Sequence, residues 1–284
     1  MPGNKKVLSI ICIVVFLLCI GIMDYPFLSR IYNEKVQGQV ISDYKGNAKT
    51  MEERDVQVQK DAAREYNRKL AERGIALEDA FSSTETDEDG YKEQLSMDED
   101  GVMGIIEIPK IQVSLPIYHG TSEEVLQKGA GHLQGSSLPV GGEDTHTCIS
   151  AHRGLPNKKM FTNVDQLENG DVFLIQVLDD TCVYEIYSIE TVTPDQTGSL
   201  EIQSGQDLAT LITCTPYGIN THRIFVHGRR ISSEEAETGE AIETAMTWRQ
   251  FAGRYGWMIM TVVLLVWMFI LLYFFNKKGN RKKK

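Results

Sequence analysis

Residues 208–226 constrain the fold of this 284-residue chain most, because they predict two adjacent strands joined by a sharp turn. Leu208 to Thr213 is a β-branched, apolar run that is typical of a mostly buried strand. It ends at Cys214, and Pro216 and Gly218 then force the chain to turn. A thiol at the end of a strand, beside a turn, is poorly placed for core packing and well placed to meet a substrate.

The second of these strands brings an arginine back towards the thiol. Strand alternation puts Arg223, Phe225 and His227 on one face, and Ile224 and Val226 on the other. The Arg223 guanidinium keeps its charge and offers several fixed donors, which suits a developing oxyanion or a peptide carbonyl. Arg223 is therefore a candidate for the same pocket as the thiol.

His152 is the best candidate for the partner that a cysteine nucleophile needs, since an unperturbed thiol is mostly protonated at neutral pH. It lies in the segment Cys148-Ile-Ser-Ala-His-Arg-Gly154, where a strand-like run enters a loop that also contains Pro156. A histidine there could protonate a leaving amine and later accept a proton from the incoming nucleophile. The alternative is a buried structural cysteine and an unrelated loop histidine.

Five segments of the chain carry a family resemblance. They are Thr210-Leu-Ile-Thr-Cys-Thr-Pro-Tyr-Gly-Ile-Asn-Thr-His-Arg223, Gly104-Ile-Ile-Glu-Ile-Pro-Lys-Ile111, Leu115-Pro-Ile-Tyr-His-Gly-Thr-Ser122, Gly131-His-Leu-Gln-Gly-Ser-Ser-Leu-Pro-Val-Gly-Gly142 and Ser150-Ala-His-Arg-Gly-Leu-Pro156. Together they resemble the sortases, and most of all the class C, pilus-assembling sortases of Gram-positive bacteria. The resemblance implies that Cys214 is the nucleophile, His152 the general acid/base and Arg223 the stabiliser of the oxyanion or substrate. It also implies a closed eight-stranded sortase-type β-barrel.

Short strand-like runs between residues 104 and 230 indicate a mainly β domain. They are residues 104–108, 114–118, 147–151, 172–177, 183–192, 208–213 and 223–226. Thr121-Ser-Glu-Glu124 is a helix-start pattern with acids in the first turn, and residues 161–167 are a candidate for a second short helix. Many short strands with few helices favour a closed or nearly closed antiparallel barrel.

Two apolar, charge-free segments lie near the ends of the chain. Residues 7–23 follow Lys5 and Lys6, and residues 257–275 precede a tail that carries six more basic residues. Both segments approach the length of a bilayer-spanning helix, although the first could instead be a cleaved signal peptide. Positive charge at both outer ends predicts a membrane protein with both termini cytoplasmic and residues 24–256 outside the cell.

The charge distribution argues against nucleic acid as a partner. All 39 acidic residues lie between the two apolar segments, whereas eight of the 29 basic residues lie in the tails. A region this acidic repels a phosphate backbone. The chain also has no Leu-Pro-x-Thr-Gly signal of its own before the second apolar segment, so we expect the enzyme that acts on such signals and not one of its substrates.

The region between the first apolar segment and the barrel divides into helix and loop. Residues 47–73 are polar and rich in helix formers, so they predict one or two exposed helices that end near Gly74. Residues 78–100 are acidic, rich in Ser and Thr, and typical of a long loop.

Within that loop the family resemblance implies a lid over the active site. Many class C sortases carry Asp-Pro-aromatic in such a lid, and Asp79-Ala-Phe81 stands at a similar place in this chain. The resemblance implies that Phe81 packs on the sulfur of Cys214 while Asp79 pairs with Arg223. Ala80 replaces the proline that would stiffen the turn, and a disordered acidic linker is the alternative.

The remaining cysteines and histidines do not form a metal or cofactor pattern. Cys148 and Cys182 could form a disulfide in an oxidising compartment, but both lie in apolar strand patterns and are expected to be buried thiols. Neither zinc-ligand nor calcium-loop spacing is found, so we expect no metal and no cofactor. Among rivals of His152, His222 should point away from the pocket, and His132 is the first to test.

These expectations describe a membrane-bound cysteine transpeptidase. Its parts would be a cytoplasmic tail (1–6), an anchor (7–23), a helical segment with the lid (24–100), the catalytic barrel (101–232), an acidic linker (233–256), a second span (257–275) and a basic tail (276–284). The resemblance implies that it cleaves an LPXTG-like signal between Thr and Gly through a thioacyl-enzyme and joins the acyl group to a pilin lysine. Alternatives are a sortase that anchors surface proteins to peptidoglycan, and a non-catalytic membrane-tethered assembly scaffold.

Overall fold

The computed structural model describes residues 3–74, 77–82, 90–97, 101–232, 256, 260–268 and 270. The chain divides into two compact units. One unit is Ser29–Glu243, and the other combines Met1–Leu28 with Thr244–Lys284. All residues predicted to be catalytic belong to the first unit.

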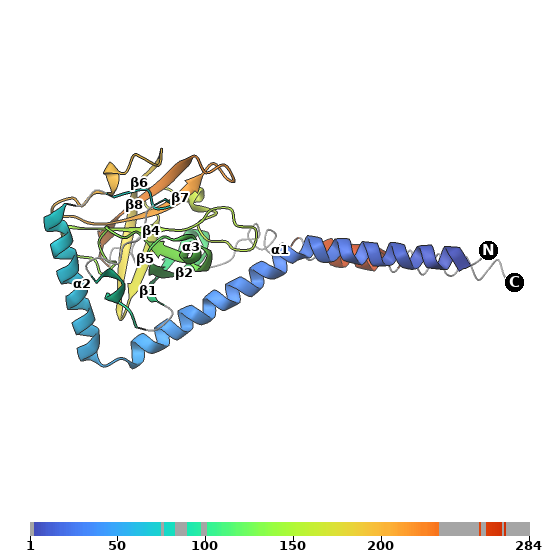
Figure 1. Cartoon of the computed structure of the whole chain (residues 1–284), viewed down its shortest axis with the longest axis horizontal. Helices are drawn as coiled ribbons and strands as arrows, with labels where there is room; N and C mark the ends of the chain where they lie inside the picture. The colour runs from blue at the N-terminus through green and yellow to red at the C-terminus, as the bar shows by residue number, and fades with distance from the viewer. Residues whose placement is uncertain are drawn as a thin grey trace. The chain divides into compact units, whose positions relative to one another are not determined.

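Eight strands form a closed barrel in the order β1-β2-β3-β4-β7-β8-β6-β5 (Figure 1). The strands are β1 Val102–Ile108, β2 Val113–His119, β3 Ala130–His132, β4 Thr145–Ser150, β5 Val172–Val177, β6 Asp180–Val192, β7 Asp207–Thr215 and β8 His222–Ile231. The predicted mainly β fold and the eight-stranded barrel are thus confirmed. Strand β3 was not predicted.

The expectation of an antiparallel barrel is wrong for two of the strand pairs. Strand β2 runs parallel to β3, and β4 runs parallel to β7. Neither pair is joined by a tight hairpin, which is the connection that forces antiparallel pairing. A short helix, α3 (Glu123–Lys128), separates β2 from β3, and two strands separate β4 from β7. The parallel β4–β7 pair matters for function because it brings the carboxyl ends of both strands to one edge of the barrel.

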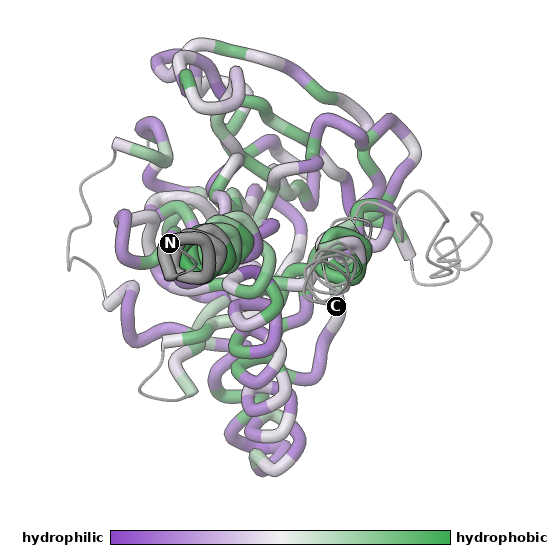
Figure 2. The backbone as a smooth tube through the Cα atoms, turned by 90° about the vertical axis from the view of Figure 1, so that its right-hand side faces the viewer, coloured by the Kyte–Doolittle hydropathy of each residue, from purple (hydrophilic) through white to green (hydrophobic). Residues whose placement is uncertain are grey.

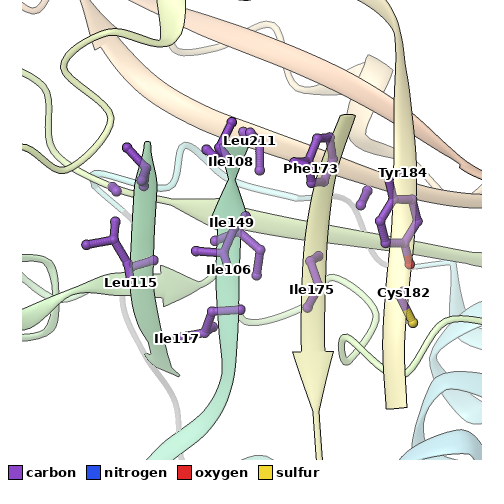
Figure 3. Close-up of a cluster of buried hydrophobic side chains, with 14 of the residues drawn as sticks. Ile106, Ile108, Leu115, Ile117, Ile149, Phe173, Ile175, Cys182, Tyr184 and Leu211 are labelled. Atoms are coloured by element: carbon purple, nitrogen blue, oxygen red, sulfur yellow. The ribbon is translucent and has the colours of Figure 1, made fainter. Parts of the chain in front are cut away.

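Inward-facing side chains from all sides of the barrel meet in one apolar core (Figure 3). Ile106 of β1, Ile149 of β4, Phe173 of β5 and Leu211 of β7 are buried in this cluster. Cys182 lies in the same core. Cys148 and Cys182 are both free and buried, so the buried thiols are confirmed and the alternative disulfide is not formed.

Helix α2 (Glu53–Arg73) lies along one side of the barrel (Figure 1). It falls in the predicted helical region and ends at Gly74, whose left-handed conformation (φ 59°) stops the helix. The buried Asn67 side chain fixes it to the barrel, since its Nδ2 donates to the Leu138 carbonyl at 3.0 Å and its Oδ1 accepts from the Leu138 N–H at 2.7 Å. Lys60 adds ion pairs to the turn between β5 and β6.

Helix α1 (Gly3–Thr50) is longer than the predicted apolar segment, because it continues through Pro26. Its first half is hydrophobic and its second half mixed (Figure 2). Near its end Tyr44 is buried and joins two barrel segments, because its hydroxyl donates to the Met103 carbonyl and accepts from the Leu178 N–H. Among the described residues α1 is the one helix long and apolar enough to cross a membrane.

The remaining described elements are short. They are α3, the 3-10 turns η1 Tyr91–Glu93, η2 Pro109–Ile111, η3 Val164–Gln166 and η4 Gly198–Leu200, and helical residues in 256–270. The predicted start of α3 is confirmed, because the Ser122 side chain caps it by accepting from the Val125 N–H. The candidate helix at 161–167 is only the single turn η3. Within the predicted second span, 257–275, residues 260–268 and 270 are described and helical, and the other positions lie outside the described residues.

Candidate active site

The hairpin of β7 and β8 places Cys214 and Arg223 directly opposite each other. Both are buried, with 6% and 7% of their surfaces exposed. Their neighbours show which side of the sheet they occupy: Ile224 belongs to the barrel core, whereas Ile212 and Phe225 belong to a separate apolar cluster outside it. The alternation that the sequence predicted for these strands therefore holds, and the thiol and guanidinium share the outer face.

Three contacts tie the loop that carries His152 to the end of β7. The Thr213 hydroxyl donates to the Ala151 carbonyl at 2.8 Å. Arg153 Nη1 donates to the Thr215 hydroxyl at 3.1 Å. The two threonines flank Cys214, and their two partners flank His152. These bonds therefore fix the position of the histidine loop relative to the cysteine. A backbone bond between the same segments completes the connection.

The His152 imidazole is mostly buried and incompletely satisfied. Its Nε2 atom is shielded from solvent and makes no hydrogen bond to any described residue. Oε2 of Glu123 lies 3.3 Å from this nitrogen, but the geometry is not that of a hydrogen bond. Glu123 begins α3 and was recognised in the sequence only as part of a helix start. Its approach to His152 could not be predicted, because the two residues are far apart in the chain.

Asp79 and Phe81 occupy the space in front of these groups. Asp79 makes a two-pronged ion pair with Arg223, with Nε–Oδ1 at 2.6 Å and Nη2–Oδ2 at 2.7 Å. The Phe81 ring centroid lies 5.0 Å from the Arg223 guanidinium carbon and 6.1 Å from the centroid of the His152 ring. One aromatic ring thus touches both the imidazole and the guanidinium. The further expectation that Phe81 packs on the sulfur of Cys214 stays a prediction.

The environment of Cys214 keeps its thiol protonated in this arrangement. Burial is the main cause that raises the pKa of Cys214 to about 11; the positive charge of Arg223 opposes this rise, and the Asp79 carboxylate adds to it. A thiol with this pKa has little thiolate at neutral pH and reacts slowly as a nucleophile. The groups that would activate the sulfur are present, but Asp79 competes for one of them.

An apolar surface extends from this site along the outer face of the barrel. We call it the apolar floor, and it consists of Leu133, Cys148, Leu200, Ile212 and Phe225. Leu77 and Ala80 are buried on it and Phe81 packs against it. The segment 77–82 therefore covers an apolar surface that lies beside the thiol.

The rival histidines are placed for other roles. His132 is fully buried, with Nδ1 2.8 Å from the Tyr91 hydroxyl and Nε2 2.8 Å from the Ser137 carbonyl. These bonds connect η1 to the barrel and leave neither ring nitrogen directed at a substrate. His222 is exposed, in contrast to the buried Arg223 beside it. Neither histidine replaces His152 as the candidate acid/base.

Two buried histidines predict how the stability of the barrel depends on pH. Burial lowers the pKa of His132 and of His146 to about 4, whereas an unfolded histidine titrates near 6.5. The unfolded chain therefore binds protons between pH 6.5 and 4 that the folded chain does not, so the free energy of unfolding falls as the pH falls through this window. We expect a loss of about 1 kcal/mol per histidine between pH 7 and 5.5.

Urea unfolding of the full chain in detergent, followed by circular dichroism at both pH values, measures this loss. His146→Gln should reduce the pH dependence, whatever it does to stability at pH 7. His222→Gln, at an exposed position, is the matched control and should leave it unchanged. Equal stability at pH 7 and 5.5 in the parent protein would contradict the prediction.

No group of three or more His, Cys, Asp or Glu residues in the described part of the chain could hold a metal ion. Metal independence nevertheless remains a prediction.

The comparisons with known proteins agree on one family for this barrel. A model described as a Sortase domain matches residues 106–231. The solved structure of sortase C from Streptococcus pneumoniae is 41% identical, with a TM-score of 0.63 over 68% of this chain and 97% of that one. Sortase C1 from Streptococcus agalactiae is 43% identical, with a TM-score of 0.64 over 69% and 99% of the two chains.

Sortase D of Bacillus subtilis, a curated relative, is 33% identical over 132 residues, which are 45% of this chain and 64% of the relative. The chain spans less than two thirds of the curated relatives that it matches first. The barrel, the site and the near-complete coverage of the streptococcal structures define the class of protein. The chain belongs to the sortase family, and the two solved structures named above, to which it is similar, are sortases C.

Proposed function

We propose that the protein is a cysteine transpeptidase that acts on an LPXTG-like sorting signal. The Cys214 thiol gives its proton to His152, the resulting thiolate attacks the carbonyl carbon of the threonine, and Arg223 donates hydrogen bonds to the oxygen as it becomes negative. The bond from this carbon to the glycine nitrogen then breaks, and His152 gives a proton to the leaving amine. The product is a thioester between Cys214 and the threonine.

In the second half of the reaction an amine attacks the thioester. His152 accepts a proton from this amine, the new amide bond forms, and the Cys214 thiolate leaves. We propose a pilin lysine as the amine, so that repeated turnover polymerises pili. The sortase C of Streptococcus pneumoniae, to which this chain is similar, is described with pilin substrates.

The observation that carries the proposal is the pairing of Cys214 with Arg223 on the outer face, with His152 against the same aromatic ring as the guanidinium. Incubating the full chain in detergent with a Leu-Pro-Glu-Thr-Gly peptide should add the mass of the Leu-Pro-Glu-Thr acyl group to the peptide fragment containing Cys214. A pilin subunit added next should release the adduct and form a ladder of covalent oligomers. No adduct on either the parent chain or its Asp79→Ala variant would sink the proposal, and an adduct released only by peptidoglycan precursors would favour wall anchoring.

We further propose that segment 77–82 is an autoinhibitory lid. The Asp79 carboxylate accepts hydrogen bonds from two nitrogens of the Arg223 guanidinium, and Phe81 covers the His152 ring. A substrate carbonyl needs the same donors, so lid and substrate exclude each other. Bidentate hydrogen bonds between arginine and carboxylate are short and strong, and we propose that the closed form is the resting state.

Asp79→Ala is expected to speed alkylation of Cys214 by iodoacetamide at pH 7. Removing the carboxylate frees Arg223 and removes one cause of the raised pKa of Cys214, and lid opening relieves the burial that is the main cause. Each unit by which this pKa falls increases the thiolate fraction about tenfold, so we expect an acceleration of at least about tenfold. Glu78→Ala removes an equal charge from the exposed neighbour and should change little. Equal rates for both variants would refute the lid.

We propose that α1 anchors the protein and that the second apolar segment also spans the membrane, with both termini cytoplasmic and the barrel outside. The length and apolar character of α1 support the anchor, and the basic residues at both outer ends support the orientation. Protease added to intact cells should then remove the barrel and spare epitopes at either end of the chain. Loss of either epitope would contradict this topology.

A further inference from the structure

A cavity of about 700 Å³ lies on the outer face of the barrel, away from Cys214. Three segments form its walls. The first is the second half of α2 with Asn67, the second is the loop before β4 with Gly142, and the third is the turn after η4 with Ser204. His146 of β4 also lines it. Nothing in the proposed chemistry uses this space.

The lid residue Leu77 stands between the cavity and the apolar floor. Leu77 and Leu200 line the cavity and also belong to the cluster that contains Ile212. Leu77 is held there because its carbonyl accepts a hydrogen bond from the Thr197 hydroxyl at 2.8 Å. When the lid leaves, Leu77 leaves with it, and the cavity and the apolar floor become one continuous surface.

Strand geometry fixes how much peptide this surface can hold. Cys214 lies six residues from Leu208 along β7, and Leu208 pairs with His146 at the cavity. At about 3.3 Å per residue this is about 20 Å. The four residues before the scissile bond of a Leu-Pro-x-Thr-Gly signal span only about 13 Å. With the scissile bond at Cys214, they extend along β7 only as far as Thr210.

The direction of the peptide follows from the chemistry of the floor. Leu and Pro are the apolar residues of the signal and precede the scissile bond, so they belong on the apolar floor. The floor extends from Cys214 towards the cavity, since Ile212 and Cys148 lie between them on β7 and β4. Residues that precede the signal therefore continue into the cavity.

The cavity mouth carries carboxylates without partners. Ion pairs occupy Arg68 and Glu72, and Arg64 is paired with a neighbour on α2. In contrast, Glu143 and Glu201 are exposed, and their carboxylates make no hydrogen bond or ion pair within the described part of the chain. A cationic side chain is the complement of such a mouth.

We infer that this cavity is an upstream subsite, which receives the residues just before the sorting signal and selects a lysine or arginine among them. The inference rests on the proposed function, because it requires the signal to be cleaved at Cys214. It assigns to the substrate a feature outside the pentapeptide: a basic residue two to four positions before the leucine.

Three peptides test the subsite on the full chain in detergent, with Asp79→Ala introduced so that the lid does not limit access. One peptide is Leu-Pro-Glu-Thr-Gly alone, the second adds Gly-Lys-Lys-Gly before it, and the third adds Gly-Glu-Glu-Gly. The rate of thioacyl formation at Cys214 is measured by mass spectrometry at low peptide concentration. The lysine peptide should react about fivefold faster than the bare one, the glutamate peptide no faster, and the advantage should shrink in high salt.

Charge-neutralising variants locate the effect. Glu143→Gln combined with Glu201→Gln should bring the lysine and bare peptides to within about twofold of each other. Glu52→Gln combined with Glu53→Gln removes the same charge at the far end of α2 and should keep the full advantage. Equal rates for all three peptides, or an advantage that survives the Glu143 and Glu201 changes, would overturn the subsite and leave the proposed function intact. Failure of every peptide to acylate Cys214 would overturn the proposed function itself.

Discussion

Cys214→Ala should abolish acyl transfer from a sorting-signal peptide, with a loss on the order of 10⁵-fold or more. The thioester cannot form without the sulfur, and the neighbouring Thr213 and Thr215 hydroxyls are engaged by the loop that carries His152. His152 and Arg223 would still bind and polarise the carbonyl, but only water could attack it. Peptide cleavage and adduct formation, measured on the full chain in detergent, check this expectation.

Cys182→Ala is the matched control for this loss. Cys182 is also a free, buried thiol, but it lies in the barrel core and not on the outer face. Its replacement should cost some stability through the small void it leaves and should keep acyl transfer near the parent level. Transfer that persists in Cys214→Ala and disappears in Cys182→Ala would reverse the assignment of the nucleophile.

The parts of the fold that local sequence patterns determine were predictable. The hairpin of β7 and β8 is marked by alternation and by a Pro-Gly turn, so the sequence alone placed Cys214 and Arg223 near each other. Strand β3 has only three residues, Ala130–His132, which is too short for alternation to register. The parallel pairing of β4 with β7 joins residues about 60 positions apart, and no local pattern encodes such a contact.

The environment of His152 illustrates the same limit. The turn after β4 was visible in the sequence, but the bonds that hold it arise only when β4 and β7 lie side by side. Arg153 reaches Thr215, and Thr213 reaches Ala151, across gaps of more than 60 residues. Glycine and proline signals could mark the loop but could not say which strand would receive it.

The lid departs from the family pattern at Ala80, and the structure gives a physical reason why the segment keeps its turn. Ala80 is buried against the apolar floor with 2% of its surface exposed. The turn is closed instead by Ser82, whose N–H donates to the Asp79 carbonyl and whose hydroxyl donates to Asp79 Oδ2. Hydrogen bonds from Ser82 thus provide a restraint that the missing proline would otherwise supply.

Arg223→Lys is expected to lower acyl transfer by about 10²- to 10³-fold, which is the usual cost of removing one oxyanion donor. Lysine keeps the charge but lacks the planar pair of N–H donors of arginine. These donors bind Asp79 in the closed form, and we expect them to bind the carbonyl oxygen during the reaction. The loss should appear mainly in kcat, because the oxygen becomes negative only on the way to the tetrahedral intermediate. Steady-state kinetics with a sorting-signal peptide and an amine acceptor measure it.

Arg223→Lys has two opposing effects on acyl transfer, one on the lid and one on the oxyanion, and a second substitution separates them. Without the arginine fork Asp79 loses its partner, so the lid opens and access to Cys214 improves; the parent background therefore understates the catalytic loss. In an Asp79→Ala background the lid is already released, and Arg223→Lys should show its full effect. Arg229→Lys on the same strand, whose exposed side chain pairs with Glu185, should be nearly neutral. If Arg223→Lys were also neutral in the Asp79→Ala background, Arg223 would serve only to hold the lid, and the oxyanion would need another donor.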